Sequence, residues 1–267
     1  MAHIEFVGPP GAGKSTLYRG LVARPSSPVV PADNATRRLL CTTLGERPAA
    51  IYRWLPDRVK RRLERELLEY RLRYRALQEL ARDRPAFLAA IADASDTATY
   101  DQLHLHRMWI DVTARYYIGM RALDDGALLA LDEGFVHRAV SFAWRESDAE
   151  AVRRYVRTMP EPGLVVSVDT PVETCLARQR TRDDVVVERP WAEGEARAIQ
   201  ERLHTLCSEV VDQLGDDVPV VEIDGTDPVD AGARAIEAAI TDELATVHRR
   251  GGTPARPWAS PDRDGES

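Results

Sequence analysis

The sequence predicts a three-layer α/β fold built on a parallel sheet. Short apolar runs alternate along the chain with longer segments of helical periodicity, and this alternation is typical of strands joined by crossover helices. A glycine-rich stretch at residues 8–16 lies between the first apolar run and the first helical segment. Two later apolar runs, 127–132 and 163–169, each end in an aspartate. Continuous apolar runs of this length are typical of strands buried on both faces.

Composition is consistent with one large α/β unit. The chain has 267 residues, 44% of them hydrophobic, and a formal net charge of −7. The negative charge argues against nucleic acid and anionic membranes as partners, and no apolar run is long enough to span a bilayer. Cys41, Cys175 and Cys207 are widely separated, which indicates a reducing compartment. Because the first strand is expected from residue 3, with no room for a signal peptide, we expect a cytoplasmic protein.

Residues 8–16 fit the pattern G-x-x-x-x-G-K-[ST], with Gly8, Pro9, Pro10, Gly11, Ala12, Gly13, Lys14, Ser15 and Thr16 in order. In such a loop backbone N–H groups surround phosphates, the lysine reaches the outer phosphates and the hydroxyl ligates Mg²⁺. The pattern requires a strand before the loop and a helix after it, and residues 3–7 and 16–22 supply them. The helix N-terminus adds positive charge where phosphates would lie. We therefore predict a nucleotide site.

The middle of the chain is helical and densely charged from about residue 46 to 93 and again from about 96 to 123. In the first of these segments a single apolar face is expected from residues spaced three and four apart, namely Leu63, Leu67, Tyr70, Tyr74 and Leu77. This segment is either a solvated amphipathic helix or an arginine surface for an anionic partner. The balance of acids and bases favours the first interpretation.

In the second helical segment Arg107, Asp111 and Arg115 are spaced four apart and share a helix face. Arginines on one face suit the phosphate of a substrate. The same spacing also suits a structural ladder of ion pairs. Both interpretations of Arg107 and Arg115 stay open at this point.

The acids after the third strand are the natural second anchor of the nucleotide site. Asp132 is expected to hold Mg²⁺ opposite Ser15, directly or through water. Glu133 is placed to accept a proton from an attacking hydroxyl or water. The alternative is a strand end that is acidic without a role.

Arginines gather where the helix after the fourth strand ends. Arg178, Arg180 and Arg182 precede a polar loop that contains Arg189. Movable arginines that close over a transferring phosphoryl group neutralise its charge and exclude water. The competing interpretation is that these cations complement the helix macrodipole. The same helix is expected to begin with a capping box, with Thr170 as the cap, Pro at the first position and Glu173 at the third.

The remainder is a last strand at 218–223, a last helix from about 227 to 247 and a tail at 248–267. The tail contains three prolines and few apolar residues, so we expect it to be disordered.

These motifs together resemble the P-loop kinases of the thymidylate kinase and deoxynucleoside kinase group. The resemblance lies in residues 8–16, in Leu-Asp-Glu-Gly-Phe-Val-His-Arg at 131–138 and in Val-Asp-Thr-Pro-Val-Glu-Thr-Cys-Leu-Ala-Arg-Gln-Arg at 168–180. It implies a P-loop NTPase fold with a five-stranded parallel sheet and a mostly helical insertion. It also implies ATP with Mg²⁺ as phosphoryl donor, a lid at 178–192 and an adenine contact at Gly225 and Thr226.

Two positions depart from the pattern of those families. They place an arginine directly after the acid of the third strand, where this sequence has Glu133, and Arg138 could compensate for it. Deoxynucleoside kinases also place a glutamate base after the second strand, where Asp33 is an approximate match. Either Asp33 or Glu133 could therefore contact the acceptor hydroxyl.

Our hypothesis from the sequence is a small-molecule kinase with one domain at 1–247, in which residues 46–125 form the acceptor side. Lys14, Arg178 and Arg182 would act on the phosphates, and a nucleoside, a nucleotide or a related natural-product hydroxyl would be the acceptor. A homodimer is left open. One rival is an ATPase whose Asp132 and Glu133 activate water and whose helical segment binds a partner. Another is a nucleotide-binding regulatory protein.

Overall fold

The computed structural model describes residues 3–25, 27–32, 72–98, 102–123, 127–145, 147–181 and 193–249, together with 52, 54–56, 58–60 and 62. The predictions for Asp33, for Arg182 and Arg189 of the lid and for most of 46–71 lie outside the described residues. So does the part of the tail from residue 250.

The five strands form one parallel sheet in the order β2-β3-β1-β4-β5. The predicted fold class is therefore confirmed, including the number of strands. Glu5 of β1 is level with Leu131 of β3, and Val7 is level with Ser167 of β4, so the carboxyl ends of these three strands meet at one edge. The strands are β1 (His3–Val7), β2 (Val29–Pro31), β3 (Leu128–Leu131), β4 (Leu164–Asp169) and β5 (Val220–Asp224).

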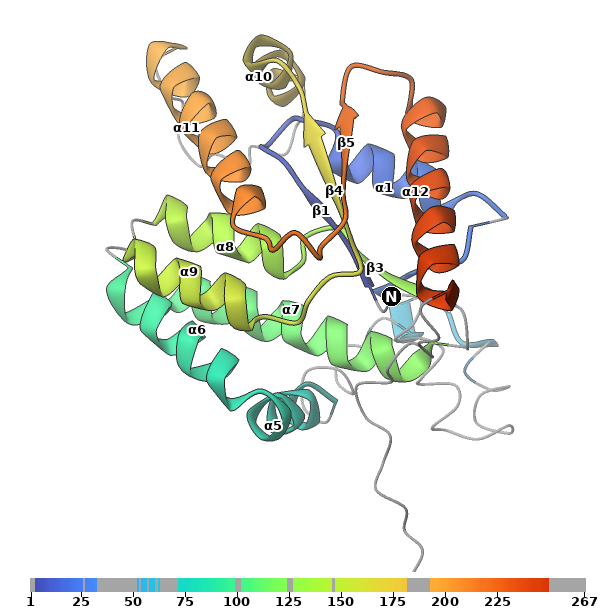
Figure 1. Cartoon of the computed structure of the whole chain (residues 1–267), viewed down its shortest axis with the longest axis vertical. Coiled ribbons are helices and arrows are strands. Elements are labelled where there is room, and N and C mark those ends of the chain that lie inside the picture. Colours follow the sequence, from blue (N-terminus) through green and yellow to red (C-terminus); the bar gives the residue numbers. More distant parts are fainter. Residues whose placement is uncertain are drawn as a thin grey trace, which may run out of the picture.

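Helices cover both faces of the sheet and make the predicted three layers (Figure 1). One face is covered by α1 (Lys14–Val22) and α12 (Val229–Arg249), which pack against each other. The other is covered by α7 (Gln102–Ala122), α8 (Phe135–Trp144) and α11 (Glu193–Asp212). Further helices pack on this second group: α5 (Arg73–Asp83), α6 (Pro85–Thr97), α9 (Ala149–Thr158) and α10 (Val172–Arg180).

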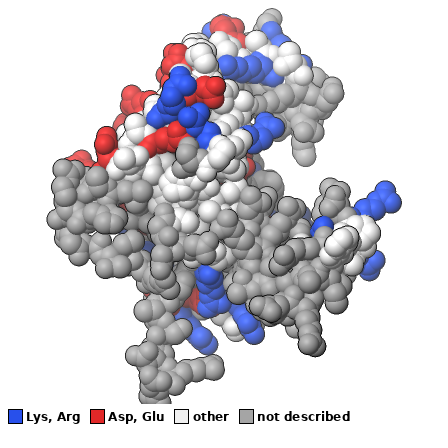
Figure 2. All heavy atoms as spheres, turned by 90° about the vertical axis from the view of Figure 1, so that its right-hand side faces the viewer, with Lys and Arg blue, Asp and Glu red and all other residues white. Residues whose placement is uncertain are grey.

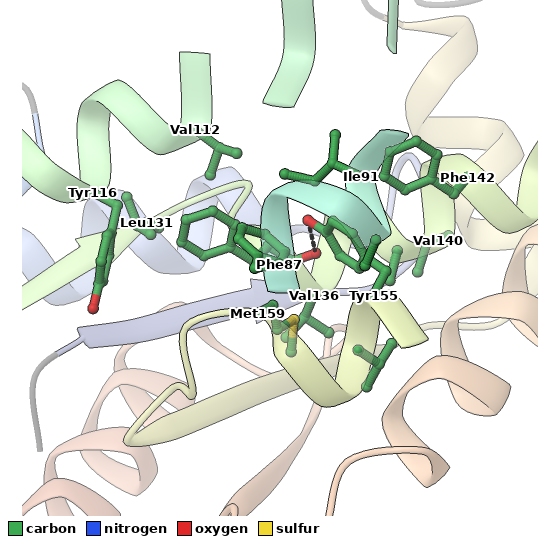
Figure 3. Close-up of a cluster of buried hydrophobic side chains, with 14 of the residues drawn as sticks. Phe87, Ile91, Val112, Tyr116, Leu131, Val136, Val140, Phe142, Tyr155 and Met159 are labelled. Carbon is green, nitrogen blue, oxygen red and sulfur yellow. Dashed lines mark hydrogen bonds between the residues drawn. The ribbon is translucent and has the colours of Figure 1, made fainter. Parts of the chain in front are cut away.

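Each face of the sheet has its own hydrophobic core. Ile4 and Phe6 point toward α1 and α12, whereas Val7 points toward the helices of the other face, as the alternation of a strand requires. The larger core contains an aromatic cluster between α6, α8 and α9, in which the rings of Phe87 and Tyr155 lie 5.1 Å apart (Figure 3). The Tyr155 hydroxyl donates to the carbonyl of residue 135 at 3.2 Å, so this cluster also holds the start of α8.

Several predicted boundaries in the helical middle and at the end of the chain need correction. A break at residue 84 separates α5 from α6, because Pro85 begins the second helix and cannot continue the first. The next helix begins at residue 102 rather than 96. Tyr74 was expected on the apolar face but is 63% exposed, and Ala76 and Leu80 are buried instead. Helix α12 continues to Arg249, two residues into the predicted tail.

The surface carries both signs of charge. On the face that Figure 2 shows, lysine and arginine side chains lie among aspartates and glutamates. Arg24, which precedes β2, pairs with Glu237 at 2.9 Å and with Asp230 at 3.5 Å, both on α12. Within the described part of the chain, every helix is too short or too polar to cross a membrane.

Candidate functional site

The glycine-rich loop leaves β1 in a conformation that only its glycines adopt without strain. Gly8, Gly11 and Gly13 have φ angles of 149°, 83° and 107°, values that residues with a Cβ rarely take. Space is also restricted, because a Cβ would lie 2.4 Å from the Val168 carbonyl at Gly8 and 2.5 Å from the Cys175 carbonyl at Gly11. Glycine is therefore required at these positions for two reasons: the backbone angles and the close packing of the loop on β4 and α10.

Lys14 is the first residue of α1 and lies across the loop. Its Nζ donates to the Gly8 carbonyl at 2.6 Å and the Pro9 carbonyl at 3.0 Å, and its side chain is buried. A compact ammonium in a loop at a helix N-terminus is suited to phosphate oxygens. The structure thus brings together the loop and the lysine that the sequence predicted.

The outer side of the loop is held by donors from Thr170, directly after β4, and from α10. The Thr170 hydroxyl donates to the Ala12 carbonyl at 2.9 Å. Arg178 donates to the same carbonyl at 3.1 Å and to the Gly225 carbonyl at 2.8 Å, so it links the loop to the turn after β5. The predicted capping box is wrong, since Pro171 is the N-cap of α10 without a side-chain cap. The Thr170 hydroxyl is used on the loop, and Glu173 pairs with Arg197 of α11.

Two glutamines that the sequence did not single out complete this outer clamp. Gln179 and Gln200 both donate to the Pro10 carbonyl, at 2.9 and 3.0 Å, and Gln179 also donates to the Gln200 side-chain oxygen at 3.0 Å. Gln200 is 2% exposed although it lies on a long charged helix. No periodicity distinguishes such a residue from a surface glutamine, so no signal in the sequence points to it.

A cavity of about 300 Å³ opens beside the loop, on the side of α1 and α12. Its walls include Gly13, Leu17, Val168, Arg178 and Gly225. A cavity with apolar walls and a few polar groups can accept a flat ring next to the phosphate loop. This is where the resemblance placed the adenine.

Of the two predicted adenine contacts, Gly225 lines this cavity and Thr226 shapes the turn. The Thr226 N–H and hydroxyl donate to Oδ1 of Asp224 at 2.7 and 2.6 Å. These two hydrogen bonds lower the pKa of the Asp224 carboxyl, because they stabilise its charged form.

The acid after β3 is joined to the helical middle by ion pairs. Oδ1 of Asp132 accepts from the Glu133 N–H at 3.0 Å and lies 3.5 Å from Arg115. Arg115 also contacts Asp111 at 3.1 Å, and Asp111 contacts Arg73 of α5 at 2.9 Å. The structure thus shows a ladder of ion pairs through Arg73, Asp111 and Arg115, and this ladder ends at the predicted metal anchor.

Arg107 is not part of that ladder. Its side chain is exposed, and the described part of the chain gives it no polar partner. The helical spacing alone had placed it with Arg115. The structure therefore brings only Arg115 of this pair to the site.

Glu133 is held by the first turn of α8. Arg138, which is 8% exposed, donates to its Oε2 at 3.2 Å, and Nε2 of His137 lies 4.0 Å from its Oε1. Burial lowers the pKa of His137 well below its usual value, and the charges of Lys14 and Arg138 add to this effect. The sequence reasoning missed His137, although its spacing of four from Glu133 was a signal.

The residues present fit Mg²⁺ in one respect. Within the described residues no cluster of three or more His, Cys, Asp or Glu side chains could hold a metal by itself. Mg²⁺ bound with a nucleotide needs only one or two protein ligands in addition to phosphates and waters. Both hydrogen-bond contacts that the described residues make with Asp132 use Oδ1, so Oδ2 could coordinate a cation. Ser15 is exposed at the start of α1.

The position of the loop in the sheet agrees with the rule for ligand sites in open α/β folds. The connection after β1 runs toward β2 on one side, and the connection after β4 runs toward β5 on the other. Ligands bind at the carboxyl edge where connections diverge in this way. A glycine-rich loop at this point of a five-stranded parallel sheet makes this a P-loop NTPase fold.

The sequence matches no family model and no curated protein. Among solved structures it is similar to deoxyadenosine kinase from M. mycoides with bound dATP, with 13% identity, a TM-score of 0.47 and coverage of 90% of this chain and 99% of that chain. It is also similar to the same enzyme with products dCMP and a flexible dCDP bound, with 14% identity, a TM-score of 0.45 and coverage of 90% and 98%.

Proposed function

We propose that this protein is an ATP-dependent phosphotransferase that moves the γ-phosphate to a hydroxyl or phosphate of a small molecule. One observation carries the proposal: the loop with Lys14 at the end of β1 lies beside Asp132 and Glu133 at the end of the neighbouring strand β3. Phosphoryl transfer requires phosphates held in place, a metal anchor and a group near the acceptor oxygen. The residues that we assign to these three tasks follow the adjacent strands β1 and β3, which supports the proposal.

In this proposal each side chain has one task at the donor end. The loop N–H groups and Lys14 hold the β- and γ-phosphates, and Ser15 and Asp132 hold Mg²⁺, which neutralises charge on the phosphates when bound. Arg178 keeps the loop and the base cavity in register through Ala12 and Gly225. Arg182 of the proposed lid would approach the transferring group from the segment that follows α10.

At the acceptor end the proposal assigns Glu133 or Asp33 to the attacking hydroxyl. Glu133 is already oriented by Arg138, and the two together can bind a hydroxyl by accepting from it and donating to its oxygen. Arg115 contacts Asp132 from the helical segment and would face the acceptor. By the family resemblance the acceptor is a nucleoside, a nucleotide or a related natural product.

A screen of acceptors with mass detection tests this function. The protein is incubated with ATP and Mg²⁺ and with panels of nucleosides, nucleotides and sugar-like alcohols, and an acceptor heavier by one phosphoryl group is the expected product. Lys14→Ala serves as the matched control and should give none. ATP turnover that does not depend on any acceptor would contradict the kinase and favour the ATPase. Tight ATP binding with no turnover across the panel would favour the regulatory protein.

A further inference from the structure

Glu5 is a buried carboxylate that the proposed mechanism does not use. It lies in the middle of β1, is 0% exposed and points toward the start of α8. A buried carboxylate is costly unless hydrogen bonds satisfy its oxygens. Its partners therefore indicate what it is for.

Each oxygen of Glu5 has a partner. Oε2 accepts from the backbone N–H of Val136 at 2.7 Å, and Oε1 accepts from Nε2 of His3 at 3.0 Å. Val136 lies in the first turn of α8, where backbone N–H groups have no partner inside the helix. Gly134, the N-cap, offers no side chain for them. A residue of another strand thus caps this helix, and its negative charge complements the helix N-terminus.

The turn before α8 is built directly over this carboxylate. A Cβ at Gly134 would lie 2.2 Å from Cδ of Glu5 and 2.4 and 2.6 Å from its two oxygens. Any residue other than glycine at 134 would therefore displace the carboxylate or the turn. The same turn carries Asp132 and Glu133, so its position decides where both acids lie.

His3 fixes the carboxylate in turn. Its ring packs edge-on against Tyr116 of α7 at 4.9 Å and against Phe135 of α8 at 6.3 Å, and it is 0% exposed. Figure 3 shows Tyr116 at the edge of the aromatic cluster, on the side of Leu131. The chain from His3 through Glu5 to Val136 is thus enclosed on all sides and joins β1, which leads into the phosphate loop, to the turn with the acids.

We propose that Glu5 is a positioning residue that holds the Asp132-Glu133 turn at a fixed distance from the phosphate loop. The inference rests on the proposed function, because it gives the turn its task. Glu5 itself touches neither nucleotide nor acceptor. Its effect is on the metal anchor and the acid beside the acceptor, through Val136 and Gly134.

The test compares Glu5→Leu with Glu5→Gln. Leucine removes the acceptor of the Val136 N–H, whereas glutamine keeps one oxygen for it and presents an amide to Nε2 of His3, which accepts in its other tautomer. Glu222→Leu replaces an exposed strand glutamate and is the control for loss of charge. Two readouts are used: hydrogen exchange of amides 132–138 without ligand, and ATP affinity by calorimetry with and without Mg²⁺.

For Glu5→Leu we expect faster exchange in 132–138 with unchanged exchange in 8–16. We also expect about a tenfold smaller gain in ATP affinity from Mg²⁺, as for other residues that orient a metal ligand. Glu5→Gln and Glu222→Leu should stay near wild type in both. Unchanged exchange and an unchanged Mg²⁺ effect in Glu5→Leu would overturn the inference, as would an equal loss in Glu222→Leu.

If Glu5→Leu does not fold, Gly134→Ala approaches the contact from the other side, since its methyl group displaces the carboxylate while Glu5 stays. It should give the same pattern, and wild-type behaviour would refute the inference. A wild-type protein that binds no ATP would refute the proposed function instead. The exchange comparison would then still decide whether Glu5 holds the turn.

Discussion

The two halves of the candidate site are built from different groups. On the donor side, most contacts involve the backbone: three glycines with positive φ and carbonyls that accept from Lys14 and Arg178. On the proposed acceptor side, side chains pair with side chains, as Glu133 does with Arg138. Asp132, at the boundary between the two sides, pairs with Arg115 in the same way. The proposed donor half depends on the conformation of the backbone, whereas the proposed acceptor half depends on ion pairs between side chains.

This difference explains why the donor half can be predicted from the sequence and the acceptor half cannot. A position that needs a positive φ and has no room for a Cβ accepts essentially only glycine, so the loop has a recognisable sequence motif. A charge pair can be made by several residues at several positions, so it leaves no fixed pattern. The variants below test whether substitutions in the two halves have different effects.

The largest effect is expected for Lys14→Ala. Loss of a positioned cation at the transferring phosphate should lower phosphoryl transfer by about 10² to 10³-fold. Lys14→Arg should not restore it, because a planar guanidinium does not replace a compact ammonium in the loop. Transfer rates and circular dichroism are measured on the same samples, and a folded Lys14→Ala with wild-type rate would refute the assignment.

The acids after β3 separate the two halves. Asp132→Asn should weaken the Mg²⁺ dependence of ATP binding and lower transfer by about 10 to 100-fold. Glu133→Gln should leave ATP affinity unchanged and lower transfer by about 10²-fold if it is the base. A Glu133→Gln variant with normal transfer would move that task to Asp33.

Much of the fold was predictable because its signals are local. The apolar runs at 127–132 and 163–169 are observed as the strands β3 (Leu128–Leu131) and β4 (Leu164–Asp169). The site was predictable where a residue type is dictated by backbone geometry or by phosphate chemistry, as at Gly11 and Lys14.

What could not be predicted depends on contacts between residues distant in the sequence. Thr170 looked like a helix cap, but its hydroxyl is used on Ala12, 158 residues earlier. Glu5 lies in the strand predicted at 3–7, but it is buried and caps a helix that begins 130 residues later. Such roles follow from the strand order, which a single sequence does not display.

Gly11→Ala tests the backbone side by stability. Gly11 has a φ of 83°, and a Cβ there would lie 2.5 Å from the Cys175 carbonyl. Alanine at this position should therefore destabilise the protein by about 1–3 kcal/mol. Gly194→Ala is the matched control, because nothing lies within 4 Å of its Cβ and it is part of α11. That change should stabilise by about 0.5–1 kcal/mol. Urea unfolding of both variants checks the pair, and equal effects would contradict the loop geometry.

His137 tests the charged side by pH. Its folded pKa lies well below 6.5 through burial and the nearby Lys14 and Arg138, so below pH 6.5 the unfolded state binds more protons than the folded state. The contribution of His137 to the free energy of unfolding should therefore be constant above pH 6.5. Below it, the contribution falls by at most about 1.4 kcal/mol per pH unit. His137→Gln should remove this part of the acid sensitivity between pH 6.5 and 5, and an identical pH profile would refute it.

The smallest effect is expected at the glutamine clamp, where the side chains of Gln179 and Gln200 bind the loop backbone. Gln200→Leu removes one of the two donors to the Pro10 carbonyl but leaves Gln179 in place. Loss of one neutral hydrogen bond costs about 1 kcal/mol, so ATP affinity should fall by about fivefold if the whole cost reaches the loop. Gln213→Leu on the turn after α11 is the control. A double variant with Gln179→Leu should lose more than the sum, because the carbonyl then has neither donor, and simple additivity would show that the two amides act separately.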